Sequence, residues 1–408
     1  MTSKFMSLNV SEGIRQATEG INRYTDGVDS WRIAFSGGKD STALLTLMIH
    51  LVQTGAVSPP DKVLIITSDT RQELPPLIKN AEYLSLLCHE QLGWETMTVR
   101  PPLEKSFLYS LLGRGLYTPG MNGSQRWCTR TLKTDPMDRS SEMYSDRGID
   151  VHSSLLLYGS RVDESDARSA RMQRSCALEG SECGSGLYTV SEGRKYAPLT
   201  NWRNCATWDW IFMAKAKTGY DPRMLMELYG SVEAKDVLES PESRTPEEVL
   251  DAIDATSRTG CIGCPVVSHD YALDRVCTWP QWQHLKPFLG LRPLYVELRE
   301  HRHRLRKPLG ETNRKGLPVL NQGRVGPIAI PSRLMALDRI REMQDESNEI
   351  AERNGLVPFI LLSDELERLI RDAISGKLYP RGWDGSEPMA VDTRPVGIRI
   401  ADAFGGQK

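Results

Sequence analysis

The sequence contains no apolar run that could cross a membrane, since no stretch approaches the roughly 20 apolar residues that a spanning helix needs. It begins Met-Thr-Ser-Lys-Phe-Met-Ser and lacks the charged and then apolar pattern of a secretory signal. With a net charge of −2, any contact with nucleic acid has to come from a local patch or a partner. We therefore expect a cytoplasmic protein without membrane association, in which the 8 cysteines do not form disulfides.

The rest of the composition is that of a globular protein, with 39% hydrophobic and 25% charged residues. A length of 408 residues favours about two or three packed units. In the first part of the chain, apolar segments of strand length alternate with segments of helical periodicity. Strands are expected at 31–35, 62–67, 95–99 and 153–158, and helices at 40–52 and 77–92. This alternation predicts a doubly wound α/β domain with a parallel sheet over residues 1–220.

The remainder of the chain has a different pattern. Helical periodicity predicts a mainly helical region over residues 221–375, with helices at 222–229, 246–255, 281–289, 332–353 and 363–374. A Cys-rich turn at 259–277 and a basic stretch at 291–327 interrupt these helices. Residues 376–408 are rich in Gly and Pro and form the expected tail. No internal repeat is visible.

The first expected strand and helix are joined by the run Ser36-Gly37-Gly38-Lys39-Asp40-Ser41-Thr42. The two glycines let backbone N–H groups approach an anion closely, and the following helix adds its positive N-terminal dipole. Lys39 supplies a full positive charge. A tight turn with a helix cap is the alternative interpretation. The run is not a Walker A loop, because Gly-x-x-x-x-Gly-Lys-Ser/Thr is absent.

This run resembles the PP-loop signature of the ATP pyrophosphatase superfamily, whose domain is of the adenine nucleotide alpha hydrolase-like, HUP type. The resemblance implies that ATP is cleaved at its α-phosphate, which releases pyrophosphate and leaves AMP on an acceptor oxygen. It implies that ATP and Mg²⁺ are bound by the loop from Ser36 to Thr42. The residues expected to be catalytic are Ser36, Lys39, Asp40 and Arg161.

Further segments resemble the phosphoadenylylsulfate reductase branch of that superfamily. They are Ser68-Asp69-Thr70-Arg71-Gln72-Glu73-Leu74-Pro75, Arg126-Trp127-Cys128-Thr129-Arg130-Thr131-Leu132-Lys133, Tyr158-Gly159-Ser160-Arg161-Val162-Asp163-Glu164-Ser165 with Arg168, and Pro198-Leu199 with Trp202, Asp209 and Trp210. Guanidinium groups can bind phosphates through two hydrogen bonds. We therefore expect Arg161 and Arg168 to contact the nucleotide, and the resemblance implies the same of Asp69.

The last third of the chain narrows the resemblance. Residues 260–267, 326–337 and 359–367 are similar to DndC/SspD-type proteins of DNA phosphorothioation. That similarity implies an enzyme that uses ATP so that sulfur replaces a non-bridging oxygen of a DNA backbone phosphate. The expected partners are DNA, a cysteine desulfurase and the other phosphorothioation subunits.

Two of the cysteines, Cys261 and Cys264, are spaced so that one metal could reach both thiols. An iron–sulfur cluster, zinc, a redox pair or a packed turn would each suit this spacing. The resemblance implies a [4Fe-4S] cluster on Cys128, Cys261 and Cys264. Cys277 is the nearest downstream candidate for the fourth ligand, and Cys205 is its rival.

The segment from Leu291 to Arg324 contains nine basic and three acidic residues, which is a local excess of six positive charges. The basic residues are Arg292, Arg299, Arg302, Arg304, Arg306, Lys307, Arg314, Lys315 and Arg324. Such an excess is typical of a surface that contacts a phosphate backbone, and a solvated helix face is the alternative.

Three other functions fit parts of the sequence. They are phosphoadenylylsulfate reduction, tRNA thiolation, and a non-catalytic ATP-sensing role. Glu182-Cys183-Gly184 echoes the C-terminal Glu-Cys-Gly-(Ile/Leu)-His motif of the reductases, but it lies in mid-chain and lacks the His. We interpret this likeness as a coincidence.

Overall fold

The computed structural model describes residues 10–120, 125–138, 140–164, 170, 172, 182, 185–190, 193–230, 260–306 and 326–390. Contacts group the chain into two units that are each discontinuous in sequence. The α/β unit comprises Met1–Arg100, Lys133–Cys261 and Tyr271–Gln283, and the helical unit comprises Pro101–Leu132, Ile262–Asp270 and His284–Lys408. The sequence-based division at residues 220 and 375 stays a prediction. The expected helix at 246–255 lies outside the described residues.

The α/β unit is built on a sheet of six strands in the order β3-β2-β1-β4-β6-β5. The strands are β1 (Ser30–Phe35), β2 (Lys62–Ser68), β3 (Glu95–Val99), β4 (Ser154–Tyr158), β5 (Leu187–Val190) and β6 (Gly193–Tyr196). Five strands are parallel, and only β5 runs antiparallel to its neighbour. The predicted α/β fold with a parallel sheet is therefore confirmed, as is the helical region that follows it.

The order of the strands creates a switch point beside β1. The chain moves from β1 to β2 and β3 on one side, and then returns to add β4 on the other side. Loops that leave the carboxyl ends of β1 and β4 diverge there. Such a crevice is where open parallel sheets bind their ligands.

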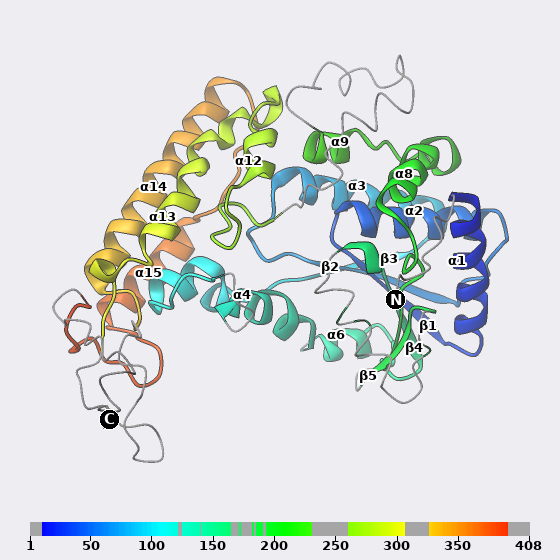
Figure 1. Cartoon of the computed structure of the whole chain (residues 1–408), viewed down its shortest axis with the longest axis horizontal. Helices are drawn as coiled ribbons and strands as arrows, with labels where there is room; N and C mark the ends of the chain where they lie inside the picture. The colour runs from blue at the N-terminus through cyan, green and yellow to red at the C-terminus, as the bar shows by residue number, and fades with distance from the viewer. Residues whose placement is uncertain are drawn as a thin grey trace, which may run out of the picture. The chain divides into compact units, whose positions relative to one another are not determined.

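Helices cover both faces of this sheet. On one face, Leu64 and Ile66 of β2 pack with Tyr144 and Ile149 around α6 (Ser141–Ser145). Figure 1 shows α2 (Lys39–Gln53), α3 (Pro75–Leu92) and α8 (Asn204–Thr218) grouped on the other side of the strands. The two faces of β2 are thus both apolar, as expected for a strand inside a parallel sheet.

The two longest helices of this unit that the sequence-based expectations lack are α1 (Val10–Thr25) and α8. In α1 the glycines weaken the helical pattern, but packing requires them. A Cβ atom on Gly13 would lie 2.9 Å from Trp202 Nε1, and one on Gly20 would overlap the Tyr196 hydroxyl. Tertiary contact has overridden helix propensity here.

The expected helix at 281–289 is wrong in type. Residues Pro280–Gly290 form the 3₁₀ helix η7, which contains Pro287. Pro287 has no N–H to donate, and a proline ring clashes with the carbonyl of the preceding turn in an α-helix, which disfavours an α-helix here. The expected helices at 222–229, 332–353 and 363–374 appear as α9 (Arg223–Tyr229), α14 (Ile330–Arg353) and α15 (Asp364–Ser375).

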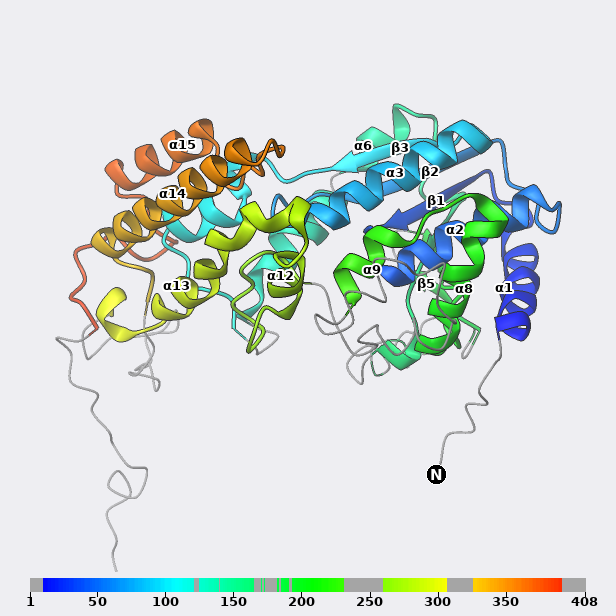
Figure 2. The same cartoon turned by 90° about the horizontal axis from the view of Figure 1, so that it is seen from above.

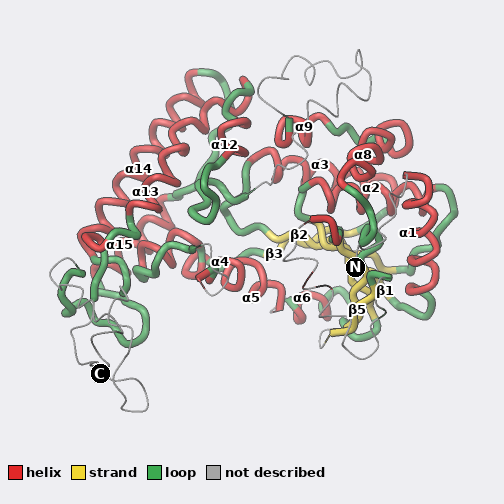
Figure 3. Tube along the Cα trace, viewed as in Figure 1, coloured by secondary structure: helices red, strands yellow, loops and turns green. Residues whose placement is uncertain are grey.

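The helical unit contains no strand among its described residues, and Figure 3 shows the strands gathered in the α/β unit. Its larger elements are η2 (Tyr109–Gly113), α13 (Leu291–Glu297), α14 and α15, and Figure 2 shows α14 beside α15. The α/β unit also contains the short helix α12 (Tyr271–Val276). No helix in the described part of the chain is long and apolar enough to cross a membrane.

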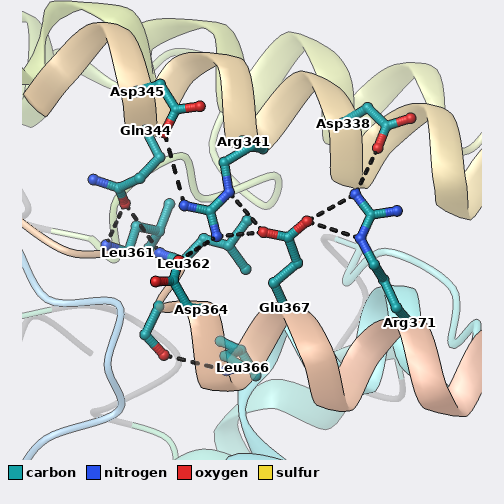
Figure 4. Close-up of polar contacts among 11 residues, drawn as sticks. Asp338, Arg341, Gln344, Asp345, Leu361, Leu362, Asp364, Leu366, Glu367 and Arg371 are labelled. Carbon is teal, nitrogen blue, oxygen red and sulfur yellow. Dashed lines mark hydrogen bonds and ion pairs between the residues drawn. The ribbon is translucent and has the colours of Figure 1, made fainter. Parts of the chain in front are cut away.

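Polar contacts join α14 to α15 and to the segment between them (Figure 4). Arg341 of α14 and Arg371 of α15 both pair with Glu367 of α15. The amide of Gln344 is fully buried. It accepts hydrogen bonds from the N–H groups of Leu361 and Leu362 and donates one to the Phe359 carbonyl.

Replacing Gln344 with Leu should leave two buried N–H groups and one carbonyl without partners, at a cost of about 3 kcal/mol in stability. Hydrogen exchange should show lost protection at the amides of Leu361 and Leu362. Arg353→Gln is the control, because its ion pair with Glu349 spans 4.0 Å between exposed side chains and contributes little. Equal protection in the two variants would contradict a structural role for the Gln344 amide.

Candidate active site

The Ser36–Thr42 loop lies at the switch point of the sheet. β1 ends at Phe35, which is level with Thr67 of β2, and Ala34 is level with Tyr158 of β4. The loop, the segment after β2 and the segment after β4 therefore leave the same edge of the sheet. Parallel pairing has brought together the three segments that the sequence singles out, although they are far apart along the chain.

Glycine is required at position 37 for two reasons. Gly37 has a φ of +74°, a backbone conformation that residues other than glycine rarely adopt. A Cβ atom there would also lie 2.4 Å from the Leu77 carbonyl oxygen of α3. The amide of Asn80 donates to the Gly37 carbonyl at 2.8 Å and to Thr42 Oγ1 at 3.0 Å. The loop is thus held against α3 by a buried side chain.

Hydroxyl groups fix the interior of the loop. Ser41 Oγ accepts from the N–H of Ser36 at 3.2 Å and donates to the Gly38 carbonyl at 3.0 Å. It also lies 3.0 Å from Ser36 Oγ. The N-cap residue of α2, Gly38, has no side chain with which to cap the helix. The first turn of α2 therefore presents backbone N–H groups and the helix dipole at the loop, which suits an anion.

A buried ion pair connects this loop to β4. Arg161 is only 1% exposed, and its Nε donates to Asp40 Oδ1 at 2.7 Å. Its two remaining nitrogens lie near the Trp202 carbonyl at 3.4 Å and Asn204 Oδ1 at 3.3 Å. In this arrangement Arg161 holds Asp40 in place, whereas the sequence suggested a guanidinium that binds phosphate directly.

Glycine at position 159 allows the chain at the end of β4 to approach the start of α2 closely. A Cβ atom on Gly159 would lie 2.5 Å from the Asp40 carbonyl oxygen, so β4 meets the start of α2 backbone to backbone. Lys39 Nζ lies 3.8 Å from Asp40 Oδ2. The structure therefore places Lys39, Asp40 and Arg161 in one connected charge cluster.

The segment after β2 forms a second polar cluster. Asp69 accepts from the N–H of Arg71 and from Arg100 Nε, both at 2.7 Å. Beside it Glu73 accepts from the N–H and hydroxyl of Thr70, and its Oε1 lies 3.8 Å from Lys133 Nζ. Burial raises the pKa of the Glu73 carboxyl above its ordinary value, and Lys133 offsets part of that increase.

The remaining expected nucleotide ligand, Arg168, lies outside the described residues. Sequence reasoning missed three others that shape the site, namely Asn80, Tyr220 and Tyr229. The Tyr220 hydroxyl donates to Asn80 Oδ1 at 2.7 Å. The Tyr229 hydroxyl lies 3.3 Å from the backbone nitrogen of Lys39. A polar Asn on the apolar face of an expected helix was the one available signal, because buried polar groups usually have a specific partner.

The candidate cluster cysteines divide between the two units, with Cys128 and Cys264 in the helical unit and Cys205, Cys261 and Cys277 in the α/β unit. Burial raises the pKa of the Cys128 thiol, and Cys264 raises it further. Cys277 is buried and Cys205 is exposed. Among the described residues, no three Cys, His, Asp or Glu side chains come together to hold a metal ion.

A [4Fe-4S] cluster needs thiolates that converge on one point. The candidate ligands come from both units, so the cluster stays a prediction, and no step below passes through it. Mg²⁺ makes a different demand, because it commonly binds substrate phosphates with only one or two carboxylates. The absence of an all-protein cage among the described residues is compatible with that mode of binding.

The basic segment is partly buried, which corrects its interpretation as a continuous charged surface. Arg304 and Arg306 are 4% and 3% exposed, and Arg304 donates to the Gly326 carbonyl. Arg302 pairs with Glu297 and Glu300. Lys307, Arg314, Lys315 and Arg324 lie outside the described residues. Two arginines of the expected footprint therefore serve the interior of the helical unit, and DNA stays a predicted partner.

A known family model matches the part of the chain that contains the Ser36–Thr42 loop. Residues 30–220 match the family model of the phosphoadenosine phosphosulfate reductase domain. This part of the chain is similar to that domain, and we refer to it below as the reductase-type domain. Within the described residues it contains every strand, the Ser36–Thr42 loop and Arg161, and it ends before α9. No curated protein matches the chain.

Several solved structures are similar to the chain. The phosphoadenylyl-sulfate reductase of Candida auris, in a phosphate complex, is 15% identical and covers 55% of this chain and 95% of its own, with a TM-score of 0.32. The U34-tRNA thiolase of Methanococcus maripaludis with its [4Fe-4S] cluster is 13% identical, with coverages of 66% and 87% and a TM-score of 0.33. The NAD⁺ synthetase of Burkholderia pseudomallei is 12% identical, with 84% and 91% covered and a TM-score of 0.35. These likenesses are too weak to bear on the reaction.

Gly37→Ala should disable the loop of the reductase-type domain, because its Cβ would meet the Leu77 carbonyl in addition to the strain of a positive φ. We expect loss of detectable pyrophosphate binding in titration calorimetry. Gly55→Ala is the matched control, since Gly55 has a φ of +71° but no atom within 4 Å of its Cβ position. It should lose about 1–2 kcal/mol of stability and keep its binding. Binding by Gly37→Ala at the wild-type level would contradict this account of the loop.

Proposed function

We propose that this chain is an ATP pyrophosphatase that activates a DNA backbone phosphate for the insertion of sulfur. The observation that carries the first half of the proposal is the loop itself. It offers backbone N–H groups, the start of α2 and Lys39 at the switch point of a parallel sheet. A diphosphate is the kind of ligand that such an arrangement binds.

In the proposed step, a non-bridging oxygen of the DNA phosphodiester attacks the α-phosphorus of ATP. The bond from that phosphorus to the oxygen bridging the α- and β-phosphates breaks, and its electron pair leaves with pyrophosphate. Negative charge grows on the leaving group, where the loop N–H groups and Lys39 stabilise it. Mg²⁺ bound to the phosphates would neutralise part of the same charge.

Asp40 and Arg161 have a positioning role in this proposal. Their buried pair fixes the first turn of α2 relative to β4 and keeps the Asp40 carboxylate 3.8 Å from Lys39 Nζ. Asp69 lies at the end of β2, at the same edge of the sheet, and its two oxygens are already hydrogen-bonded. It therefore suits the binding of a nucleotide hydroxyl more than proton transfer.

The acceptor and the sulfur source rest on the sequence. The segments at 260–267, 326–337 and 359–367 support a phosphorothioation enzyme. In it, the outer sulfur of a persulfide from a cysteine desulfurase attacks the adenylated DNA phosphate and AMP leaves. A thiol reductant then cleaves the S–S bond and leaves the sulfur on the phosphate. The cluster stays a prediction, and the proposed chemistry assigns the cysteines no role in the reaction.

Lys39→Ala should slow pyrophosphate release from ATP about 100-fold, because it removes a positive charge from the leaving group. Release can be followed by a coupled phosphate assay with the purified chain, DNA and Mg²⁺. Lys62→Ala is the control, since Lys62 lies at the opposite, amino end of a neighbouring strand and donates to the Gly148 carbonyl. Equal rates of pyrophosphate release by the wild type and Lys39→Ala would contradict the catalytic proposal.

A second candidate, sulfonucleotide reduction, is favoured by the family match over residues 30–220. Two assays separate the candidates. With a cysteine desulfurase, cysteine, a thiol reductant, ATP and DNA, the phosphorothioation enzyme should yield nuclease-resistant phosphorothioate dinucleotides detectable by mass spectrometry. A reductase should instead release sulfite from phosphoadenylyl sulfate with thioredoxin. Sulfite release without any modified DNA would overturn the DNA proposal.

A further inference from the structure

Helix α9 lies outside the matched reductase-type domain, yet its last residue contacts the Ser36–Thr42 loop. The backbone N–H of Lys39 donates to the Tyr229 hydroxyl at 3.3 Å. Lys39 is the first residue of α2, so this N–H is one of the donors that have no partner inside the helix. A tyrosine oxygen therefore lies next to a donor that an anion would use.

The same hydroxyl faces the open side of Gly38. A Cβ atom on Gly38 would lie 3.4 Å from the Tyr229 hydroxyl and 3.6 Å from Ser36 Oγ. Two hydroxyls thus flank the one stretch of loop that carries no side chain. The ammonium of Lys39 lies 5.7 Å from the centroid of the Tyr229 ring, which adds a positive charge at the same place.

Packing holds this tyrosine in position. Tyr229 is 4% exposed, and its ring meets Trp208 edge to face with centroids 5.3 Å apart. Next to it, the Leu228 carbonyl accepts a hydrogen bond from Arg275 at 2.7 Å. Figure 1 shows α9 beside α3, the helix that also contacts Gly37. The hydroxyl is therefore preorganised at the loop.

We propose that Tyr229 is a further phosphate-binding residue of this site, an inference that rests on the proposed function. A phenol both donates and accepts hydrogen bonds. Its oxygen accepts from the Lys39 N–H, and its O–H turns toward an oxygen of a pyrophosphate group bound over Gly38. The phosphate site then has a ligand from α9 in addition to those of the reductase-type domain.

The test uses the full chain and inorganic pyrophosphate with Mg²⁺ in titration calorimetry. Tyr229→Phe keeps the ring and removes only the hydroxyl, so its Kd for pyrophosphate should rise about tenfold, the loss expected for one hydrogen bond to a charged group. The control is Tyr295→Phe, which makes the same chemical change at a buried hydroxyl without a hydrogen-bond partner among the described residues. Its Kd should match that of the wild type.

Adenosine binding, followed by ligand-observed NMR, distinguishes a phosphate contact from a general structural defect. Tyr229→Phe should bind adenosine like the wild type, and an equal loss for both ligands would overturn the inference. Wild-type or tighter binding of pyrophosphate by Tyr229→Phe would also overturn it, the latter because the hydroxyl then competes with the anion. Failure of the wild type to bind pyrophosphate at all would instead overturn the proposed function.

Discussion

The candidate site depends on the buried pair of Arg161 and Asp40. A guanidinium that is 1% exposed is stable only if its charge and its donors are matched, and Asp40 supplies the charge. Because Asp40 belongs to the first turn of α2, matching that charge also fixes where the helix starts. The direction of the backbone N–H groups at the loop then follows from the position of β4.

Several parts of this arrangement could be predicted from the sequence, because they depend on local patterns. A few consecutive residues are enough to recognise the apolar runs at 31–35 and 62–67 and the glycines between strand and helix. Since parallel strands end at one edge, Asp69 and Arg161 could also be assigned to the neighbourhood of the loop. Each of these steps uses short-range periodicity and one general rule of topology.

Other parts could not be predicted, because they depend on which distant residue fills a particular space. Asn80 is a polar residue in an expected helix, and only its contact with the Gly37 carbonyl explains it. The arginines of the basic segment looked alike in sequence, but Arg304 is buried against a carbonyl whereas Arg302 pairs with acids at the surface. Charge composition cannot distinguish these uses. The spacing of Cys261 and Cys264 likewise says nothing about where Cys277 lies.

The loop is encoded near the start of the chain, but the residues that complete it are encoded much later. The backbone N–H of Lys39 donates to Tyr229, and Asp40 pairs with Arg161. Both of these partners are synthesised after the loop. A ribosome adds residues from the N-terminus at about 5–20 per second. For roughly ten seconds or more, therefore, a nascent chain carries the glycine loop and Asn80 but not yet Tyr229. The proposed nucleotide site is thus completed late in synthesis, when α9 has emerged and the long-range parallel pairing is complete.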